Sequence, residues 1–171
     1  MGKIIAIVGM CGSGKSVACD YLENLGYKKV YFGGVTMDKL KEIGLEITPD
    51  NEKMMREKLR QDLGMGAYAK VLLPKIKELS INNNVVLDGL YSWDELVILN
   101  NEFKMTTIAV VADKKLRYER LEKRVVRPFS KSDAIKRDVS EIENIAKAGP
   151  IAYADYLSLI HISEPTRLGM I

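Results

Sequence analysis

Short apolar runs alternate with amphipathic stretches along most of this chain. The runs at 3–8, 27–32, 85–87 and 106–112 are rich in β-branched and aromatic residues, which is typical of buried strands. Between them, apolar residues recur three and four positions apart. This spacing predicts helices at 16–25, 37–43, 51–63, 66–79, 93–103, 114–124 and 133–147. A fifth strand is expected to begin within 152–156, so the pattern predicts an α/β fold with a parallel sheet covered on both faces.

The segment between the first strand and the first helix fits the phosphate-binding pattern G-x-x-x-x-G-K-[ST] at every fixed position. It reads Gly9, Met10, Cys11, Gly12, Ser13, Gly14, Lys15 and Ser16, and Val17 follows. Such glycines let backbone N–H groups surround a polyphosphate, and the helix N-terminus adds partial positive charge. We expect Lys15 to reach the β- and γ-phosphates and Ser16 to ligate Mg²⁺. The segment therefore predicts an ATP and Mg²⁺ site, the alternative being a chance match in a glycine-rich turn.

A carboxylate stands at the end of the third predicted strand, where Asp88 and Gly89 follow Val-Val-Leu. At the carboxyl end of a core strand beside a phosphate loop, such a group can hold a Mg²⁺-bound water or orient an acceptor. A simple strand-end Asp-Gly turn is the alternative interpretation. We interpret Asp88 as a catalytic and metal-binding residue, and Gly89 as part of the acceptor site.

Arginines gather around the predicted 114–124 helix. Three share one helical face and one follows the helix: Arg117, Arg120, Arg124 and Arg127. Phosphoryl transfer needs cations over the transferring group, and arginine supplies bidentate donors. We hypothesise that at least one of Arg120, Arg124 and Arg127 clamps the phosphate, within a lid over about 114–135. For any single arginine, a solvated basic face is the alternative.

The stretch 33–80 is long and entirely helical between two strands. An insertion of this kind beside a phosphate loop is a natural place to hold a second substrate. Arg56 and Arg60, four residues apart, are candidates for binding an acceptor phosphate, and an exposed helix face is an equally good interpretation.

Composition restricts the class of protein. The 171 residues are 47% hydrophobic and 29% charged, which suits a globular domain with a core. The net charge of +3 is too small to indicate nucleic acid or an anionic membrane as a partner. No apolar run is long enough to span a bilayer, and no signal-peptide pattern is present. Cys11 and Cys19 lack metal-ligand spacing, which predicts free thiols and a cytoplasmic location.

The last residues have a different character. The stretch 157–167 resembles the in-frame translation of a widely used transposase sequencing adapter. We therefore hypothesise that 157–171 is a non-native tail behind one natural domain at 1–156. The tail holds His161, the only histidine, so that domain would lack histidine acid–base chemistry. The segment 157–160 is nevertheless apolar enough to complete a strand.

Together, the phosphate loop, the Val-Val-Leu-Asp-Gly strand end and the arginine helix resemble the nucleoside monophosphate kinase branch of P-loop proteins. That branch includes adenylate kinase and dephospho-CoA kinase. The stretches 44–51, 59–70, 117–124 and 152–156 are similar to a largely archaeal family of predicted nucleotide kinases related to dephospho-CoA kinase. The resemblance implies a P-loop NTPase three-layer fold with a five-stranded parallel sheet, a helical acceptor-binding insertion and an arginine-bearing lid. It also implies γ-phosphoryl transfer from Mg-ATP to a small phosphate- or hydroxyl-bearing acceptor.

Two positions depart from the resemblance: Gly33-Gly34 stands where those relatives often carry an acid, and Tyr91 where they often carry an arginine. Dephospho-CoA kinase proper is thus one alternative function, and the missing acid argues against it. A slow NTP-hydrolysing switch module is another, although the sequence has no Asn-Lys-x-Asp motif of the kind that GTPases use. A rate stimulated by an acceptor would separate a kinase from a switch.

Overall fold

Five parallel strands form a single sheet in the computed structural model, which describes residues 1–125 and 128–159. The sheet order is β2-β3-β1-β4-β5. The strands are β1 (Ile4–Val8), β2 (Lys28–Tyr31), β3 (Val85–Asp88), β4 (Met105–Val111) and β5 (Tyr156–Leu159). Each neighbouring pair runs parallel, which confirms the predicted five-stranded parallel sheet.

Helices connect these strands in the alternating order that the sequence predicts. They are α1 (Lys15–Asn24), α2 (Gly34–Glu42), α3 (Pro49–Leu63), α4 (Ala67–Asn82), α5 (Trp93–Glu102), α6 (Lys114–Glu122), α7 (Lys131–Glu143) and α8 (Ala148–Ala152). In the described part of the chain, none of them is both long and apolar enough to cross a membrane.

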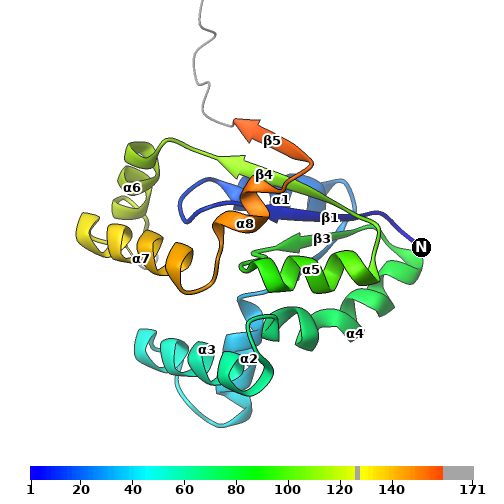
Figure 1. The fold of residues 1–171 in the computed structure, drawn as a ribbon, viewed down its shortest axis with the longest axis horizontal. Helices are drawn as coiled ribbons and strands as arrows, with labels where there is room; N and C mark the ends of the chain where they lie inside the picture. The colour runs from blue at the N-terminus through cyan, green and yellow to red at the C-terminus, as the bar shows by residue number, and fades with distance from the viewer. Residues whose placement is uncertain (126–127, 160–171) are drawn as a thin grey trace, which may run out of the picture.

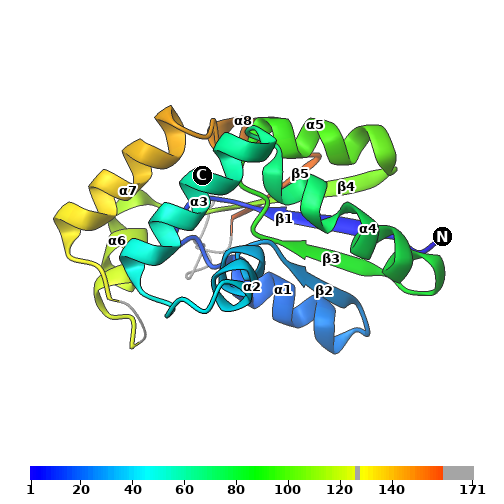
Figure 2. The same ribbon diagram turned by 90° about the horizontal axis from the view of Figure 1, so that it is seen from below.

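The sheet is the middle of three layers, because alternate residues of β1, β3 and β4 enter different apolar clusters. Ile4, Ala6 and Val8 pack in the larger cluster with residues of α4 and α5, whereas Ile7 packs with Cys19 of α1 on the other face. Figure 1 and Figure 2 show α1 on one side of the sheet and α4, α5 and α8 on the other. The carboxyl ends of the strands point toward α6 and α7. In open α/β sheets, ligands bind at this edge.

The insertion between β2 and β3 is helical throughout its regular structure, as predicted, and holds α2, α3 and α4. The start of α3 follows from its sequence: the Thr48 hydroxyl accepts a hydrogen bond from the Asn51 amide at 3.2 Å, and Pro49 occupies the first helical position. α4 continues through Pro74. α2 begins at Gly34, directly after its N-cap residue Gly33.

The prediction for the C-terminal part needs one correction. The expected helix over 133–147 ends at Glu143, because Ala146 adopts a left-handed conformation with φ 49°. The short helix α8 follows, and the last strand begins at Tyr156, the final residue of the predicted range. Residues 157–159 of the predicted tail lie in β5 beside β4, and the rest of that tail, 160–171, lies outside the described residues.

A buried carboxyl group stabilises the start of α5. Ser92 and Glu95 form a capping box, in which the Ser92 hydroxyl accepts from the Glu95 amide and Glu95 Oε2 accepts from the Ser92 amide. Glu95 is fully buried, and its Oε1 has no hydrogen-bond partner among the described residues. Burial raises the pKa of Glu95 to about 7. The folded chain therefore retains a proton that the unfolded chain releases.

We predict that Glu95→Gln changes how stability depends on pH. Between a pKa of 4.5 in the unfolded chain and about 7 in the folded one, wild-type stability falls as pH rises, by about 3 kcal/mol in total. Glutamine keeps an acceptor oxygen and cannot ionise. The free energy of unfolding of the variant, relative to wild type, should thus increase by about that amount from pH 4 to pH 8 in urea titrations. A difference that is constant with pH would contradict this prediction.

Candidate functional site

The phosphate loop lies between the end of β1 and the start of α1, and glycines fix its shape. Gly12 has φ 78°, and a Cβ there would lie 2.7 Å from the Arg117 carbonyl oxygen. Gly9 has φ 148°, and a Cβ there would collide with the Val110 carbonyl oxygen. Both positions thus need glycine for conformation and for space. The loop is held between β4 and α6, with the N-terminus of α1 directly behind it.

A cleft of about 1040 Å³ opens over this loop and brings most of the predicted site residues together. Its lining includes Cys11, Gly12, Gly14, Lys15, Ser16, Arg56, Arg60, Asp88, Gly89, Arg120 and Arg124. Gly9, Met10 and Ser13 belong to the loop but are not part of the described lining, and the side chain of Val17 is exposed outside it. Arg127 lies outside the described residues.

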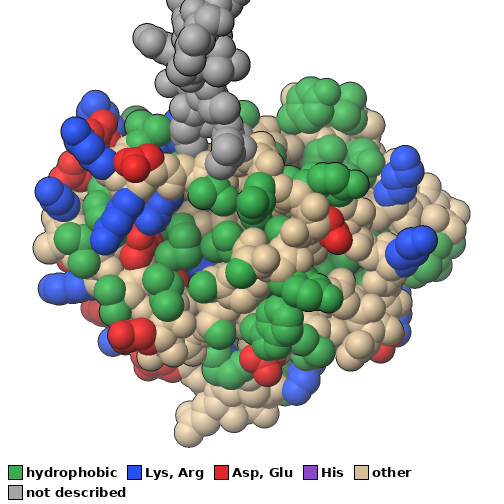
Figure 3. All heavy atoms as spheres, turned by 45° about the horizontal axis from the view of Figure 1, so that its top comes forward, with side chains coloured by type: hydrophobic (Ala, Val, Ile, Leu, Met, Phe, Trp, Pro, Cys, Tyr) green, Lys and Arg blue, Asp and Glu red, His purple; other side chains and the backbone are tan. Residues whose placement is uncertain are grey.

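Positive charge is concentrated in this cleft. Eight cationic side chains and four carboxylates line it: Lys15, Lys53, Arg56, Arg60, Arg120, Arg124, Arg137 and Lys147 against Glu52, Glu57, Asp88 and Glu141. The resulting excess of four positive charges is larger than the net charge of +3 on the whole chain. Figure 3 shows further basic side chains, with carboxylates among them, on the side of the molecule formed by α6 and α7. The cleft is therefore suited to an anionic ligand.

The ammonium group of Lys15 lies inside the loop, where Nζ donates a hydrogen bond to the Met10 carbonyl at 3.0 Å. Burial lowers the pKa of Lys15 to about 8, and repulsion by Lys147 acts in the same direction. A phosphate group placed next to this lysine would favour its charged form. The site is thus arranged so that anion binding and protonation of Lys15 support each other.

Asp88 ends β3 and is paired in register with Ile7, so it stands beside the start of the phosphate loop. Burial raises the pKa of Asp88, while Lys29 and Lys15 act in the opposite direction. Asp88 and Ser16 both line the cleft and offer oxygen ligands, which Mg²⁺ prefers. These residues fit a magnesium ion, which would supply positive charge to phosphate oxygens. The neighbouring Cys19 is buried, and its pKa is raised to about 12, which makes it a poor nucleophile at neutral pH.

The predicted arginines of α6 have two different environments. Arg120 and Arg124 line the cleft, and a Cβ on Gly14 would lie 3.7 Å from an Arg120 nitrogen. Arg117 instead points to α7, where its guanidinium forms two hydrogen bonds, of 3.0 and 2.6 Å, with the Asp138 carboxylate. The same side chain donates to the Cys11 carbonyl at 3.0 Å. Arg117 therefore joins α7 to the phosphate loop.

A second group of charged residues in the cleft was missed by the sequence reasoning. Glu141 of α7 accepts from Arg137 Nε at 3.1 Å and from Lys147 Nζ at 2.6 Å. The ammonium group of Lys147 also lies 5.0 Å from the centroid of the Tyr91 ring. A continuous 133–147 helix gave Lys147 no particular role. Ala146, directly before Lys147, has a left-handed backbone conformation that turns the chain toward the cleft. An alanine does not predict such a turn from the sequence.

The insertion contributes one wall of the cleft, and α6 and α7 contribute residues to another. The Arg60 guanidinium lies 5.6 Å from the centroid of the Tyr68 ring, and the Tyr68 hydroxyl is 2.7 Å from the Thr36 hydroxyl. Arg56 forms an ion pair of 3.4 Å with Glu52 within α3. Arg56 and Arg60, which the sequence singled out, thus face the same space as the phosphate loop. Residues of both α3 and α7 line the cleft, and Figure 1 shows α7 above α3.

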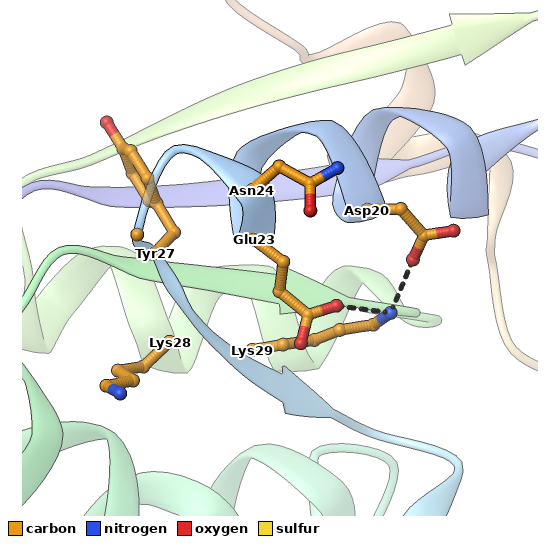
Figure 4. Close-up of a pocket in the computed structure, with 7 residues that line it drawn as sticks. Asp20, Glu23, Asn24, Tyr27, Lys28 and Lys29 are labelled. Carbon is orange, nitrogen blue, oxygen red and sulfur yellow. Dashed lines mark hydrogen bonds and ion pairs between the residues drawn. The ribbon is translucent and has the colours of Figure 1, made fainter.

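A separate open hollow of about 530 Å³ lies between α1 and β2. Figure 4 shows that the Lys29 side chain crosses it to reach two carboxylates of α1. Lys29 Nζ lies 2.9 Å from Asp20 and 3.0 Å from Glu23. Because these two carboxylates neutralise the Lys29 charge, the hollow does not resemble the anion-binding cleft.

The chain is similar to known proteins over most of its length. A family model described as an AAA domain matches residues 5–143. The chain is 36% identical to a UPF0200 protein of Thermococcus onnurineus over 160 residues, which cover 90% of the chain and 86% of that relative. It is 34% identical to a UPF0200 protein of Aeropyrum pernix over 157 residues, with 90% and 82% covered.

Among solved structures, TT1252 from Thermus thermophilus has a TM-score of 0.62 at 17% identity and covers 91% of the chain, with 87% of its own length matched. A shikimate kinase from Bacteroides thetaiotaomicron has a TM-score of 0.56 at 13% identity, with 91% of this chain and 85% of the kinase covered. At these identities the structures establish a shared fold. That fold is the P-loop kinase-like fold which the sequence predicts.

We predict that ATP binding takes up a proton above pH 8. The pKa of Lys15 is about 8 in the protein without nucleotide, and adjacent phosphates raise it. ATP affinity should therefore decrease as pH rises from 8 to 9.5, because a deprotonated Lys15 must first gain its proton. Calorimetric titrations in buffers of different ionisation enthalpy measure this uptake. Lys15→Arg, which stays charged throughout, should abolish it, and uptake that persists in this variant would assign the proton to another group.

We predict that Arg117→Met destabilises the fold by about 3 to 5 kcal/mol, because it leaves the Asp138 carboxylate buried without its cation. Urea denaturation measures the loss. Removing both charges, in Arg117→Met with Asp138→Asn, should recover a large part of it. Lys136→Met, an exposed position on the same α7 helix, serves as the control for loss of one positive charge. A loss below about 1 kcal/mol in the single variant would show that the pair does not hold the lid.

Proposed function

This chain belongs to the UPF0200 family and contains a P-loop domain of the AAA type, and from this premise we propose that it is an ATP-dependent kinase. The proposed reaction transfers the γ-phosphoryl group of Mg-ATP to a small nucleotide-type acceptor. One observation carries this proposal: a single cleft joins the phosphate loop to a second, arginine-bearing wall from the insertion. A protein that only binds or hydrolyses a nucleotide has no need of the second wall.

The phosphate loop supplies the donor side. Its backbone N–H groups and the N-terminus of α1 surround the phosphates of ATP, and Lys15 places its charge beside the β- and γ-phosphates. Ser16 and Asp88 would hold Mg²⁺, which neutralises charge on the phosphate oxygens when it is bound. Arg120, next to Gly14, lies where it can stabilise the charge that spreads over the transferring group.

The insertion supplies the acceptor side. Arg56 and Arg60 offer planar guanidinium groups for a phosphate of the acceptor, and Tyr68 places an aromatic ring beside them. Asp88 lies between the two walls and can orient an acceptor oxygen toward the donor. Cations on both walls therefore favour an acceptor that itself carries phosphate, which is why we place a nucleotide ahead of an uncharged molecule.

The fold neighbours support a small acceptor. Two of them are named as kinases of small molecules, a shikimate kinase and a gluconokinase from Sinorhizobium meliloti with a TM-score of 0.50. Dephospho-CoA kinase activity is the alternative within the same class. A slow NTP-hydrolysing switch is the alternative from another class.

We predict that ADP release from Mg-ATP is stimulated by one acceptor in a panel of nucleoside monophosphates and dephospho-CoA. Lys15→Ala should reduce the stimulated rate by about 100-fold or more, because it removes charge stabilisation from the transferring group. Lys28→Ala also removes one positive charge, from the hollow between α1 and β2, and should leave the rate unchanged.

Stimulation by dephospho-CoA alone would select the dephospho-CoA kinase alternative. A slow, Lys15-dependent rate that no acceptor changes would contradict the kinase proposal and favour the switch.

A further inference from the structure

Lys147 is a buried lysine in the lining of the cleft, and it lies outside the phosphate loop. We propose that Lys147 is a phosphate-binding residue which contacts the terminal phosphate of ATP, on the side that faces the acceptor. This inference rests on the proposed function, because it assigns a role within the same cleft. It is carried by how the chain places Lys147, by the charges around it and by its position relative to the loop.

The backbone turns specifically to bring Lys147 into the cleft. α7 ends at Glu143, and Ala146 then adopts φ 49°, which is unfavourable for a residue with a side chain. The Lys147 amide donates to the Glu141 carbonyl at 3.1 Å and closes this turn. As a result Lys147 is only 3% exposed, and it still lines the cleft. A lysine needed only for solubility would not be placed in this way.

The charges around Lys147 do not cancel. Glu141 is one carboxylate shared by two cations, Arg137 and Lys147, so this group of three keeps one positive charge. Lys15 adds a further positive charge and Asp88 a negative one, so these five groups keep one positive charge, and the two lysines repel each other. Positive charges that are buried together without full compensation are stabilised by an anion between them. An ammonium group has three N–H donors, and Glu141 is the one acceptor for them among the described residues, so donors remain for a ligand.

The position of Lys147 indicates which phosphate it contacts. Its ammonium lies over the Tyr91 ring, and Tyr91 folds back over the turn after β3, where a Cβ on Gly89 would be 3.2 Å from the Tyr91 hydroxyl. Through Tyr91, Lys147 therefore lies on the side of the cleft next to the Asp88-Gly89 turn, whereas the phosphate loop lies between the end of β1 and the start of α1. A polyphosphate held by the amides of that loop presents its terminal phosphate toward Asp88. The contact thus belongs to the group that is transferred, and not to the α- or β-phosphate.

The competing explanation is that Lys147 only neutralises Glu141. Lys147→Met together with Glu141→Gln distinguishes the two, because it removes both members of the pair and leaves no unpaired carboxylate. Lys147→Met alone, Lys147→Arg, and the exposed Lys136→Met of α7 complete the set. Calorimetry gives the affinities of Mg-ATP and Mg-ADP for each variant, and thermal unfolding shows that each is folded.

We expect Lys147→Met to weaken Mg-ATP binding about tenfold or more and Mg-ADP binding less than about twofold. The double variant should show the same selective loss, Lys147→Arg should recover most of the ATP affinity, and Lys136→Met should change neither affinity. If Lys147→Met does not fold, the double variant supplies the measurement.

A double variant with wild-type ATP affinity would overturn the proposal and leave Lys147 as a partner of Glu141 only. Equal losses for ATP and ADP would also overturn it, because the contact would then lie nearer the β-phosphate. Both results leave the kinase proposal standing, provided that the wild type binds ATP. A wild type that does not bind ATP would remove both proposals together.

Discussion

Repulsion between like charges is the constraint on which the rest of this structure depends. The cleft gathers eight cationic side chains against four carboxylates at the edge of the sheet where parallel strands end. A fold gains nothing from crowding cations into a partly buried space, since each one lowers the stability of the charged form of the others. This arrangement is compensated when a polyanion enters. The charge of the cleft therefore suits a polyanion, and we propose that this polyanion consists of phosphates held from two sides.

A small number of ion pairs make that arrangement possible. Arg117 joins Asp138 of α7 and the Cys11 carbonyl of the phosphate loop, so α6, α7 and the loop cannot move independently without breaking a buried pair. Glu141 draws Arg137 and Lys147 together from two segments of chain. These pairs hold Arg137 and Lys147 in the lining of the cleft that contains the phosphate loop. Gly12 also contributes to the contact between the loop and α6, because the Arg117 carbonyl leaves no space for a Cβ there.

The sequence was sufficient for the architecture, because strand patterning predicted the parallel sheet. The structure places Lys15, Ser16 and Asp88 in one cleft, and their roles toward a nucleotide stay predictions. The sequence did not predict the end of α7, which depends on the backbone conformation of a single residue. Ala146 breaks the expected helix and turns Lys147 inward, although alanine is the strongest helix former. The separate direction of Arg117 depends on a carboxylate 21 residues away, which helical spacing within α6 does not reveal.

The most direct test of the central claim is to follow the label of γ-labelled ATP and ask where it goes. If the two walls of the cleft hold a donor and an acceptor, the label should appear mainly in the acceptor nucleotide, and much less in inorganic phosphate. Transfer of this kind should disappear with Lys15→Ala. Label that appears only as inorganic phosphate, at a rate no acceptor alters, would contradict the account and show that the second wall does not bind a phosphate acceptor.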